Sequence, residues 1–128
     1  MSPNPVWGAR SFSFLPFRMT DNRLELLQGT LDLLVLKALS WGPMHGYGVS
    51  LLIHDRTDGD ITIVDAALYK ALHRLEHADL IASTWGLSEN NRRAKFYRLT
   101  PEGRKRLRDE LSDWRRYSAA VERIVGAT

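Results

Sequence analysis

The sequence contains no cysteine. This absence excludes disulfide frameworks, thiolate metal sites and thiol nucleophiles, and it fits a reducing compartment such as the cytoplasm. No run of residues approaches the roughly 18 consecutive apolar positions of a membrane-spanning helix. The N-terminal residues also lack the basic start, continuous apolar region and small-residue cleavage site of a signal peptide. We therefore expect a cytoplasmic protein with no membrane segment.

Motifs of common enzymes are missing as well. The sequence has no nucleophile elbow, no P-loop and no dinucleotide fingerprint, and the H-E-x-x-H order of zinc proteases is absent. His73 and His77 are spaced for one face of a helix, but two imidazoles alone do not complete a tetrahedral metal site. We therefore expect neither an enzyme nor a bound metal or other cofactor.

The 128 residues suit one domain, and the hydrophobic fraction of 44% and charged fraction of 26% are those of a globular protein. The formal net charge of +3 permits nucleic-acid binding without requiring it. Residues 1–20 are interpreted as a flexible arm or a misassigned start, since translation from Met19 would leave the first 18 residues outside the protein. In the first case their aromatic side chains would pack on a partner subunit. Residues 21–99 are expected to form the main domain, and residues 100–128 a C-terminal helix.

Three short helices are predicted in succession, with tight turns between them. The first, Leu24–Ser40, is apolar over so much of its circumference that a partner subunit should cover its second side. The second runs from His45 to Arg56, where Gly46 and Gly48 suggest that backbones pass closely. The third, Asp65–His77, has Asp65 as its expected N-cap. Three residues can cap the first helix: Thr20, Asp21 or Asn22.

The third helix has two different faces. One carries an apolar stripe at i, i+3, i+4 and i+7, and the other carries cations, imidazoles and a tyrosine hydroxyl. Glu76 is the main acidic exception. Such a helix can bury one side and offer the other to phosphates and base edges, although an ordinary solvated amphipathic helix has the same pattern. The residues expected to contact DNA from this helix are Tyr69, Lys70, His73 and Arg74.

A β-hairpin with a basic tip is predicted next. Leu80–Trp85 and Lys95–Leu99 alternate in polarity, and the turn-rich segment Gly86–Ala94 joins them. The cations of this tip that we expect on DNA phosphates are Arg92, Arg93 and Lys95. Three helices followed by a basic hairpin outline a winged helix, whose third helix enters the major groove while the wing lies along the backbone. The expected fold class is mainly α with a small β-hairpin: a winged helix-turn-helix plus a C-terminal dimerisation helix.

The C-terminal helix begins with Thr100-Pro101-Glu102, which combine a good cap, a favoured first position and a favourable charge. It is predicted to run to about Val125. Its apolar residues repeat at alternating intervals of four and three positions and form a heptad seam, in which Ser118 is the one weak position. The seam either packs back on the first helix or forms a homodimer. Trp114 beside the small Ser118 leaves space for a planar aromatic effector at the dimer centre. The predicted effector and dimer interface is Leu107, Leu111, Trp114, Ser118, Val121 and Val125.

Five segments resemble, in order and spacing, the PadR-like transcriptional regulators. They are L-L-Q-G-T-L-D-L-L-V-L-K-A-L (26–39), G-P-M-H-G-Y-G (42–48), L-Y-K-A-L-H-R-L-E (68–76), L-I-A-S-T-W-G (80–86) and R-R-A-K-F-Y-R-L-T-P-E-G (92–103). The resemblance covers about residues 24–124. It implies a sequence-specific regulator of double-stranded DNA, most often a homodimeric repressor, sometimes released by a small hydrophobic or aromatic molecule. In some drug-responsive members a tryptophan that matches Trp114 lines a pocket at the dimer centre.

Three positions depart from the family pattern. Val64 stands where a small hydroxyl residue is usual, Ala67 where serine or threonine is frequent, and Lys70 where proline is common. Val64 removes a good helix cap, Ala67 removes a phosphate hydrogen bond, and Lys70 adds a cation. The binding mode can therefore be carried over, but the target sequence cannot. The alternative function is a winged-helix protein-interaction module without a DNA target.

Overall fold

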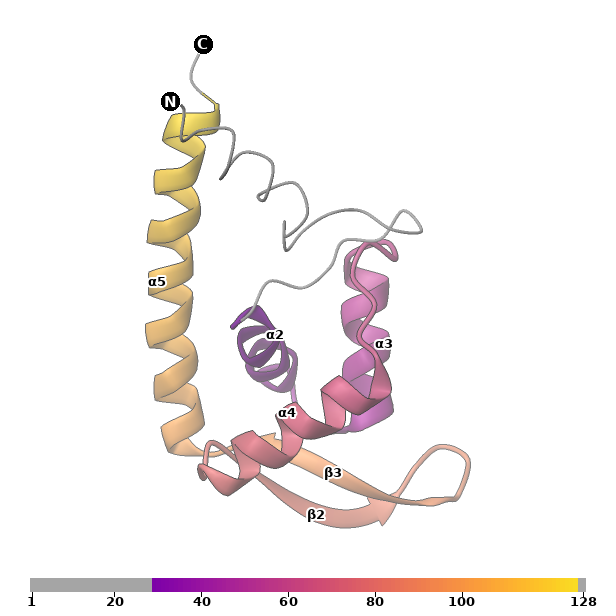
Figure 1. Ribbon diagram of the computed structural model, residues 1–128. Coiled ribbons are helices and arrows are strands. Elements are labelled where there is room, and N and C mark those ends of the chain that lie inside the picture. Colours follow the sequence, from indigo (N-terminus) through magenta and orange to yellow (C-terminus); the bar gives the residue numbers. More distant parts are fainter. Residues whose placement is uncertain (1–28, 127–128) are drawn as a thin grey trace, which may run out of the picture.

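The computed structural model describes residues 29–126, and the structural statements that follow concern this part of the chain. The elements follow in the order α2 (Thr30–Leu39), β1 (Met44–His45), α3 (Gly46–Arg56), α4 (Asp65–His77), β2 (Ile81–Leu87), β3 (Arg93–Leu99) and α5 (Pro101–Val125). Figure 1 shows α2, α3 and α4 gathered above the hairpin of β2 and β3, with α5 rising beside them as a long rod. The fold is the predicted winged helix with a long C-terminal helix.

The core lies between the three short helices, the base of the hairpin and the first half of α5. One face of α4 is buried, through Leu68, Ala71, Leu72 and Leu75. These are the positions of the predicted apolar stripe, so hydrophobic periodicity fixed both the bounds and the orientation of this helix. The largest fully buried side chains are Leu36, Leu68, Leu72, Ile81, Val35 and Val49.

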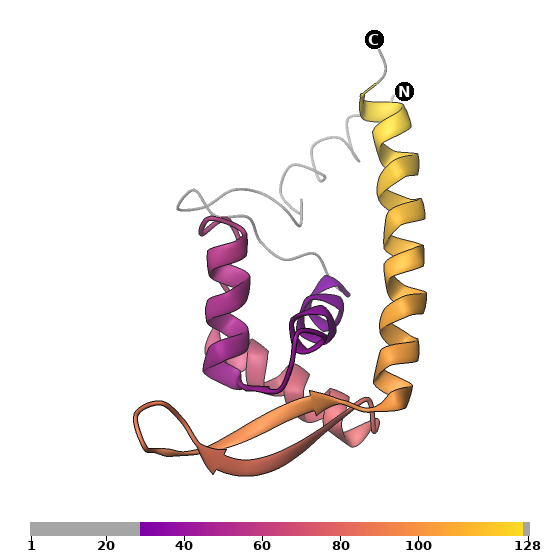
Figure 2. The same ribbon diagram turned by 180° about the vertical axis from the view of Figure 1, so that it is seen from behind.

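The hairpin is longer, and its tip shorter, than predicted. Leu87 pairs with Arg93 and Gly86 with Ala94, so both strands continue into the segment that was expected to be loop. The tip is closed by the Ser88 N–H, which donates to the Arg92 carbonyl at 2.9 Å. Figures 1 and 2 show this tip projecting past α3, on the side away from α5. The basic residues are therefore distributed along a strand as well as at the tip.

The sheet has a third strand that the sequence did not predict. β1 pairs with β3, with Met44 opposite Tyr97 and His45 opposite Phe96, which gives the antiparallel order β1-β3-β2. Two residues are too few to show a period-two pattern of polarity. β1 therefore joins the turn that follows α2 to strand β3 of the hairpin.

The start of α2 and the N-cap of α4 differ from prediction. α2 begins at Thr30 and not at Leu24, because Gly29 at its N-cap has a φ of 92°, a left-handed conformation that interrupts an α-helix. Residues 24–28 lie outside the described part of the chain, as do the N-terminal arm and the expected caps Thr20, Asp21 and Asn22. For α4, Asp65 is wrong as the N-cap: Val64 occupies that position without a side-chain hydrogen bond, and Asp65 is the first helical residue.

The start of α5 agrees with prediction. The Thr100 hydroxyl oxygen accepts a hydrogen bond from the Gly103 N–H at 3.0 Å, and Pro101 is the first helical residue. Leu107 is buried and Leu111 packs against the core, so the first half of the helix covers α2. Most of the second half extends beyond the other described elements, as Figure 2 shows.

Candidate nucleic-acid interface

The outward face of α4 forms one continuous stripe. Ala66, Lys70, His73 and His77 follow each other at intervals of four, three and four residues, which places them on one side of the helix, and all four are exposed. The rings of His73 and His77 lie 6.4 Å apart between centroids and are nearly parallel. The structure thus brings the predicted Lys70 and His73 together on the exposed side. The sequence reasoning passed over Ala66 and His77 as site residues, although their spacing already placed them on this face.

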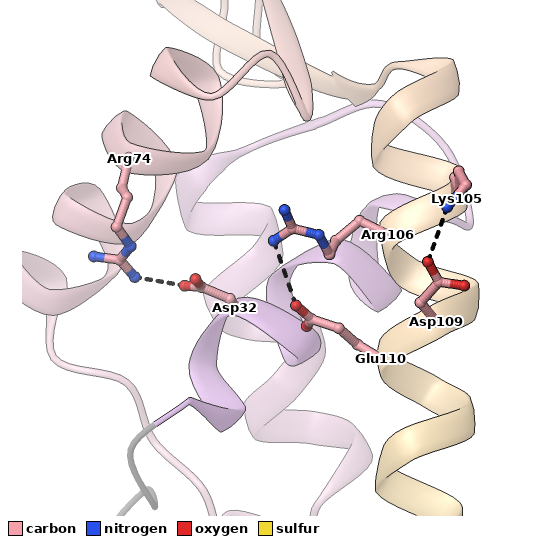
Figure 3. A network of polar contacts seen from close by, with 6 residues as sticks. All are labelled: Asp32, Arg74, Lys105, Arg106, Asp109 and Glu110. Carbon is pink, nitrogen blue, oxygen red and sulfur yellow. Dashed lines mark hydrogen bonds and ion pairs between the residues drawn. The ribbon is translucent and has the colours of Figure 1, made fainter.

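Arg74 lies on one flank of the stripe and is occupied within the protein. Its guanidinium forms an ion pair with Asp32 of α2, which Figure 3 shows bridging the two helices. The same view includes the ion pairs of α5 between Arg106 and Glu110 and between Lys105 and Asp109. Arg74 therefore connects α4 to α2, and a DNA contact would require it to exchange or share its partner.

Tyr69 lies on the other flank, against the start of α3. A Cβ atom on the buried Gly46 would stand 3.1 Å from the Tyr69 hydroxyl oxygen, which is tighter than ordinary packing. Gly46 thus makes room for the Tyr69 ring. The prediction that two backbones pass closely here was wrong, because the neighbour is a side chain. The ring is still 52% exposed, so its outer face remains free for a ligand.

Glu76, the acidic exception on α4, is turned toward the wing. Its Oε2 accepts a hydrogen bond from the Ser83 hydroxyl at 2.6 Å, and its Oε1 accepts one from Lys95 Nζ at 3.3 Å. The Ser83 hydrogen bond, helped by Lys95, lowers the pKa of this carboxyl group. The negative charge of Glu76 is thus paired within the protein, with Lys95 of β3.

The three predicted wing cations have different surroundings. Arg92 is exposed at the tip, whereas the Arg93 guanidinium lies 4.5 Å from the centroid of the Trp85 ring. Lys95 is bound to Glu76 and also lies 5.7 Å from the centroid of Tyr97. Only the first two cations are therefore available without breaking an ion pair.

A wing groove of about 890 Å³ separates the hairpin from the start of α3 and the flank of α4. Its walls combine aromatic rings with charged groups, among them Tyr47, Tyr69, Trp85, Arg93, Lys95 and Tyr97. Burial raises the pKa of the Tyr97 phenol above its ordinary value. Aromatic and cationic walls suit a sugar-phosphate strand that passes between helix and wing. The sequence reasoning did not assign Tyr47 or Trp85 to the site, because only the fold brings them together.

His45 joins this groove to the helix-turn-helix. Its Nδ1 accepts a hydrogen bond from the Gly48 N–H at 3.0 Å, which caps α3, and its Nε2 lies 3.6 Å from a carboxylate oxygen of Glu89 at the wing tip. This contact with His45, together with a backbone hydrogen bond that is the larger cause, lowers the pKa of Glu89. The wing tip is thus in contact with the first turn of α3.

The predicted seam of α5 divides into two parts. Leu107 and Leu111 belong to the chain's own core, as the alternative of packing back on the first helix requires. Beyond them Trp114 is 39% exposed, Val121 40% and Val125 69%. Ser118 lies between them and is half-buried. An apolar stripe therefore continues past the point where the described chain covers it.

Residues 29–126 form neither a metal-ion cluster nor a membrane-spanning helix. Between residues 29 and 126 no three His, Asp or Glu side chains are grouped so as to hold a metal ion. No helix in this range combines the length and the apolar character that crossing a bilayer would require.

The comparisons with known proteins agree on one family. The model of the "Transcriptional regulator PadR-like family" matches residues 35–109. A transcriptional regulator from Clostridium thermocellum is 33% identical, with a TM-score of 0.70 over 77% of this chain and 92% of that one. A PadR family transcription regulator from Clostridium difficile R20291 is 26% identical, with a TM-score of 0.67 over 76% and 99%. Bacillus subtilis PadR, solved in complex with operator DNA, shares the fold at 22% identity and a TM-score of 0.58, over 64% and 46%.

Proposed function

The chain belongs to the PadR-like family of transcriptional regulators, and we propose that it binds operator DNA sequence-specifically as a homodimeric repressor. The observation that carries the proposal is the outward stripe of α4, where Lys70 and His73 are exposed, on the same helix as Tyr69, which lines the wing groove. Bacillus subtilis PadR, which shares the fold, was solved in complex with operator DNA, and this supports DNA as the ligand. A regulator of this kind acts where the DNA is, which places it in the cytoplasm.

In this proposal α4 enters the major groove. Lys70 and His73 face base edges, Tyr69 contacts the backbone on the groove side, and Arg92 and Arg93 bind phosphates from the wing. The phosphate strand between the two contacts lies in the wing groove. Arg74 and Lys95 contribute less than their charge suggests, since each is paired with an acidic residue in the free protein.

A mobility-shift assay with the chain's own upstream region tests the proposal against its rival, a protein-interaction module. Lys70→Ala should lower the discrimination between operator and scrambled duplex by about 1–3 kcal/mol. The matched control is Lys105→Ala, which removes a lysine of α5 that is paired with Asp109. An equal loss of affinity in both variants would show that Lys70 contributes only its charge and no sequence specificity. If no duplex is shifted, the protein-interaction module is favoured.

The wing makes a separate contribution to affinity. Removing Arg92 or Arg93 should weaken binding to all sequences about equally, and each should lower the salt slope by about one unit. Lys95→Ala should change the slope less, because its ammonium group is already paired with Glu76. Equal slopes for all three variants and the parent protein would show that the wing does not touch phosphates.

The effector is part of the proposal as well. A planar aromatic molecule could stack on Trp114 where two copies of α5 meet, next to the gap left by Ser118. The alternative is that Trp114 packs only against the partner subunit. With Trp7, Trp41 and Trp85 replaced, a bound aromatic compound should quench Trp114 fluorescence, and in the parent protein the same compound should weaken operator binding. Quenching without a change in DNA affinity would leave a pocket that has no regulatory role.

A further inference from the structure

We propose that Glu76 is a positioning residue, which fixes the angle between the recognition helix and the wing so that both can engage DNA together. The inference rests on the proposed function, because it assigns this residue a part in DNA binding. It also gives a reason for the carboxylate that sequence analysis found to be out of place on a basic helix face.

The first observation is that one carboxylate bonds to both strands of the wing. Ser83 belongs to β2 and donates to Oε2, while Lys95 belongs to β3 and donates to Oε1. Within the described part of the chain, all side-chain hydrogen bonds between α4 and these two strands end at Glu76. The residue is therefore the polar connection between the recognition helix and the wing.

The second observation is the position of the Glu76 contacts along the hairpin. At the base of the hairpin Ile81 and Leu99 are buried in the core and hold the strands against the helices. Trp85, which pairs with Lys95, is already 60% exposed. Glu76 thus acts at the point where apolar packing ends and the wing begins to project. A change in angle at this point is amplified toward Arg92 at the tip.

The third observation is the second contact of the wing with the helix-turn-helix. Glu89 at the tip approaches Nε2 of His45, whose other nitrogen caps α3. Glu89 is almost fully exposed, so this contact is weak and screened by solvent. The Glu76 side chain is only 31% exposed, and the hydrogen bond that its carboxylate accepts from Ser83 is short. The angle of the wing therefore depends more on Glu76 than on Glu89.

Positioning and simple electrostatics predict opposite results for Glu76→Ala. The variant removes a negative charge near DNA and releases the ammonium group of Lys95, both of which should raise affinity and steepen its salt dependence if charge alone mattered. If Glu76 sets the angle of the wing, affinity falls in spite of the better charge. The sign of the change thus separates the two roles.

The experiment compares operator affinity of the parent protein, Glu76→Ala, Glu76→Gln and Asp65→Asn at one salt concentration. Asp65 is the matched control, an exposed carboxylate on the same helix that makes no hydrogen bond or ion pair with other described residues. We expect about tenfold weaker binding for Glu76→Ala, equivalent to about 1.4 kcal/mol. Glu76→Gln, which still accepts a hydrogen bond from Ser83, should be intermediate. Asp65→Asn should bind as tightly as the parent or more tightly.

Equal or tighter binding by Glu76→Ala would overturn the proposal. Thermal unfolding identifies a variant that fails to fold, and Glu76→Gln then serves as the informative variant. A parent protein that prefers no DNA sequence would instead remove the proposed function. Residual dipolar couplings of the free protein distinguish the two failures, because Glu76→Ala should change the angle between α4 and the wing even without DNA. An unchanged angle would contradict the role assigned to Glu76.

Discussion

Val64 occupies a position where a side-chain oxygen usually accepts a hydrogen bond from the first helical turn. It is 71% exposed at the start of α4, and its isopropyl group leaves the N–H groups of that turn without a side-chain acceptor. The charge of Asp65 partly compensates, since it stands at the positive end of the helix dipole. The sequence showed that Val64 cannot cap the helix, but it assigned the N-cap one residue too late, to Asp65.

Replacing Val64 by serine should therefore stabilise the protein by about 1 kcal/mol, because the hydroxyl oxygen can accept a hydrogen bond from the first turn. The free energy of unfolding in urea measures this gain. Val64→Ala is the control, since it shortens the side chain without adding an acceptor. A serine variant no more stable than the alanine variant would show that the N–H groups are already satisfied by water.

Two glycines in helices should respond in opposite ways to alanine. A Cβ on Gly103 would stand 1.9 Å from the Leu80 carbonyl oxygen, so Gly103→Ala must push α5 away from the hairpin. Overpacking of this kind costs about 1–3 kcal/mol or more. A Cβ on Gly48 would meet nothing closer than 3.4 Å, and alanine there should gain about 0.5–1 kcal/mol. Similar melting temperatures for the two variants would contradict the described packing of α5 on Leu80.

At the scale of elements, the sequence predicted long segments with a regular polarity pattern better than short ones. α4 and α5 have strong helical periodicity and clear starts, and their predicted ends agree with the structure. β1 is two residues long, and the hairpin tip looked like loop because its polar composition hid the pairing of Leu87 with Arg93. Ion pairs such as that of Arg74 with Asp32, 42 positions apart, arise only from the fold, so no local pattern could predict them.

The link between α4 and the wing should weaken in acid. The pKa of Glu76 is lowered from its ordinary value of 4.5, first by the hydrogen bond from Ser83. Its contribution to stability is therefore fully present above pH 4.5 and is lost as the pH falls through the lower pKa of the folded state. The difference in unfolding free energy between the parent protein and Glu76→Gln should shrink over this range. A difference that is constant from pH 6 to pH 3 would contradict the lowered pKa.

At the scale of the whole molecule, the second half of α5 is the feature that one chain leaves incomplete. Its apolar stripe continues the line of Leu107 and Leu111 past α2, and Val121 and Val125 are exposed in the described chain. Pairing with a second copy across a two-fold axis would cover this stripe. It would also allow two recognition helices to stand about 34 Å apart, one turn of duplex.

Val121→Asp should convert the proposed dimer into monomers at micromolar concentration, because a carboxylate would be buried in the seam. Light scattering after size-exclusion chromatography gives the mass. Ala119→Asp adds the same charge about 200° around the helix from Val121, outside the seam, and should leave the dimer intact. Monomers in the parent protein would contradict the dimer, and dimers in both variants would place the interface elsewhere.

The central claim is that this chain distinguishes DNA sequences through α4, and its most direct measurement is fluorescence anisotropy with two duplexes. One duplex carries the chain's own upstream region, and the other has the same bases in scrambled order. At a fixed physiological salt concentration the upstream duplex should bind about 10³-fold more tightly or better, the lower end of specific recognition. Lys70→Ala should reduce this ratio while Lys105→Ala preserves it. Equal affinities of the parent protein for the two duplexes would contradict the claim.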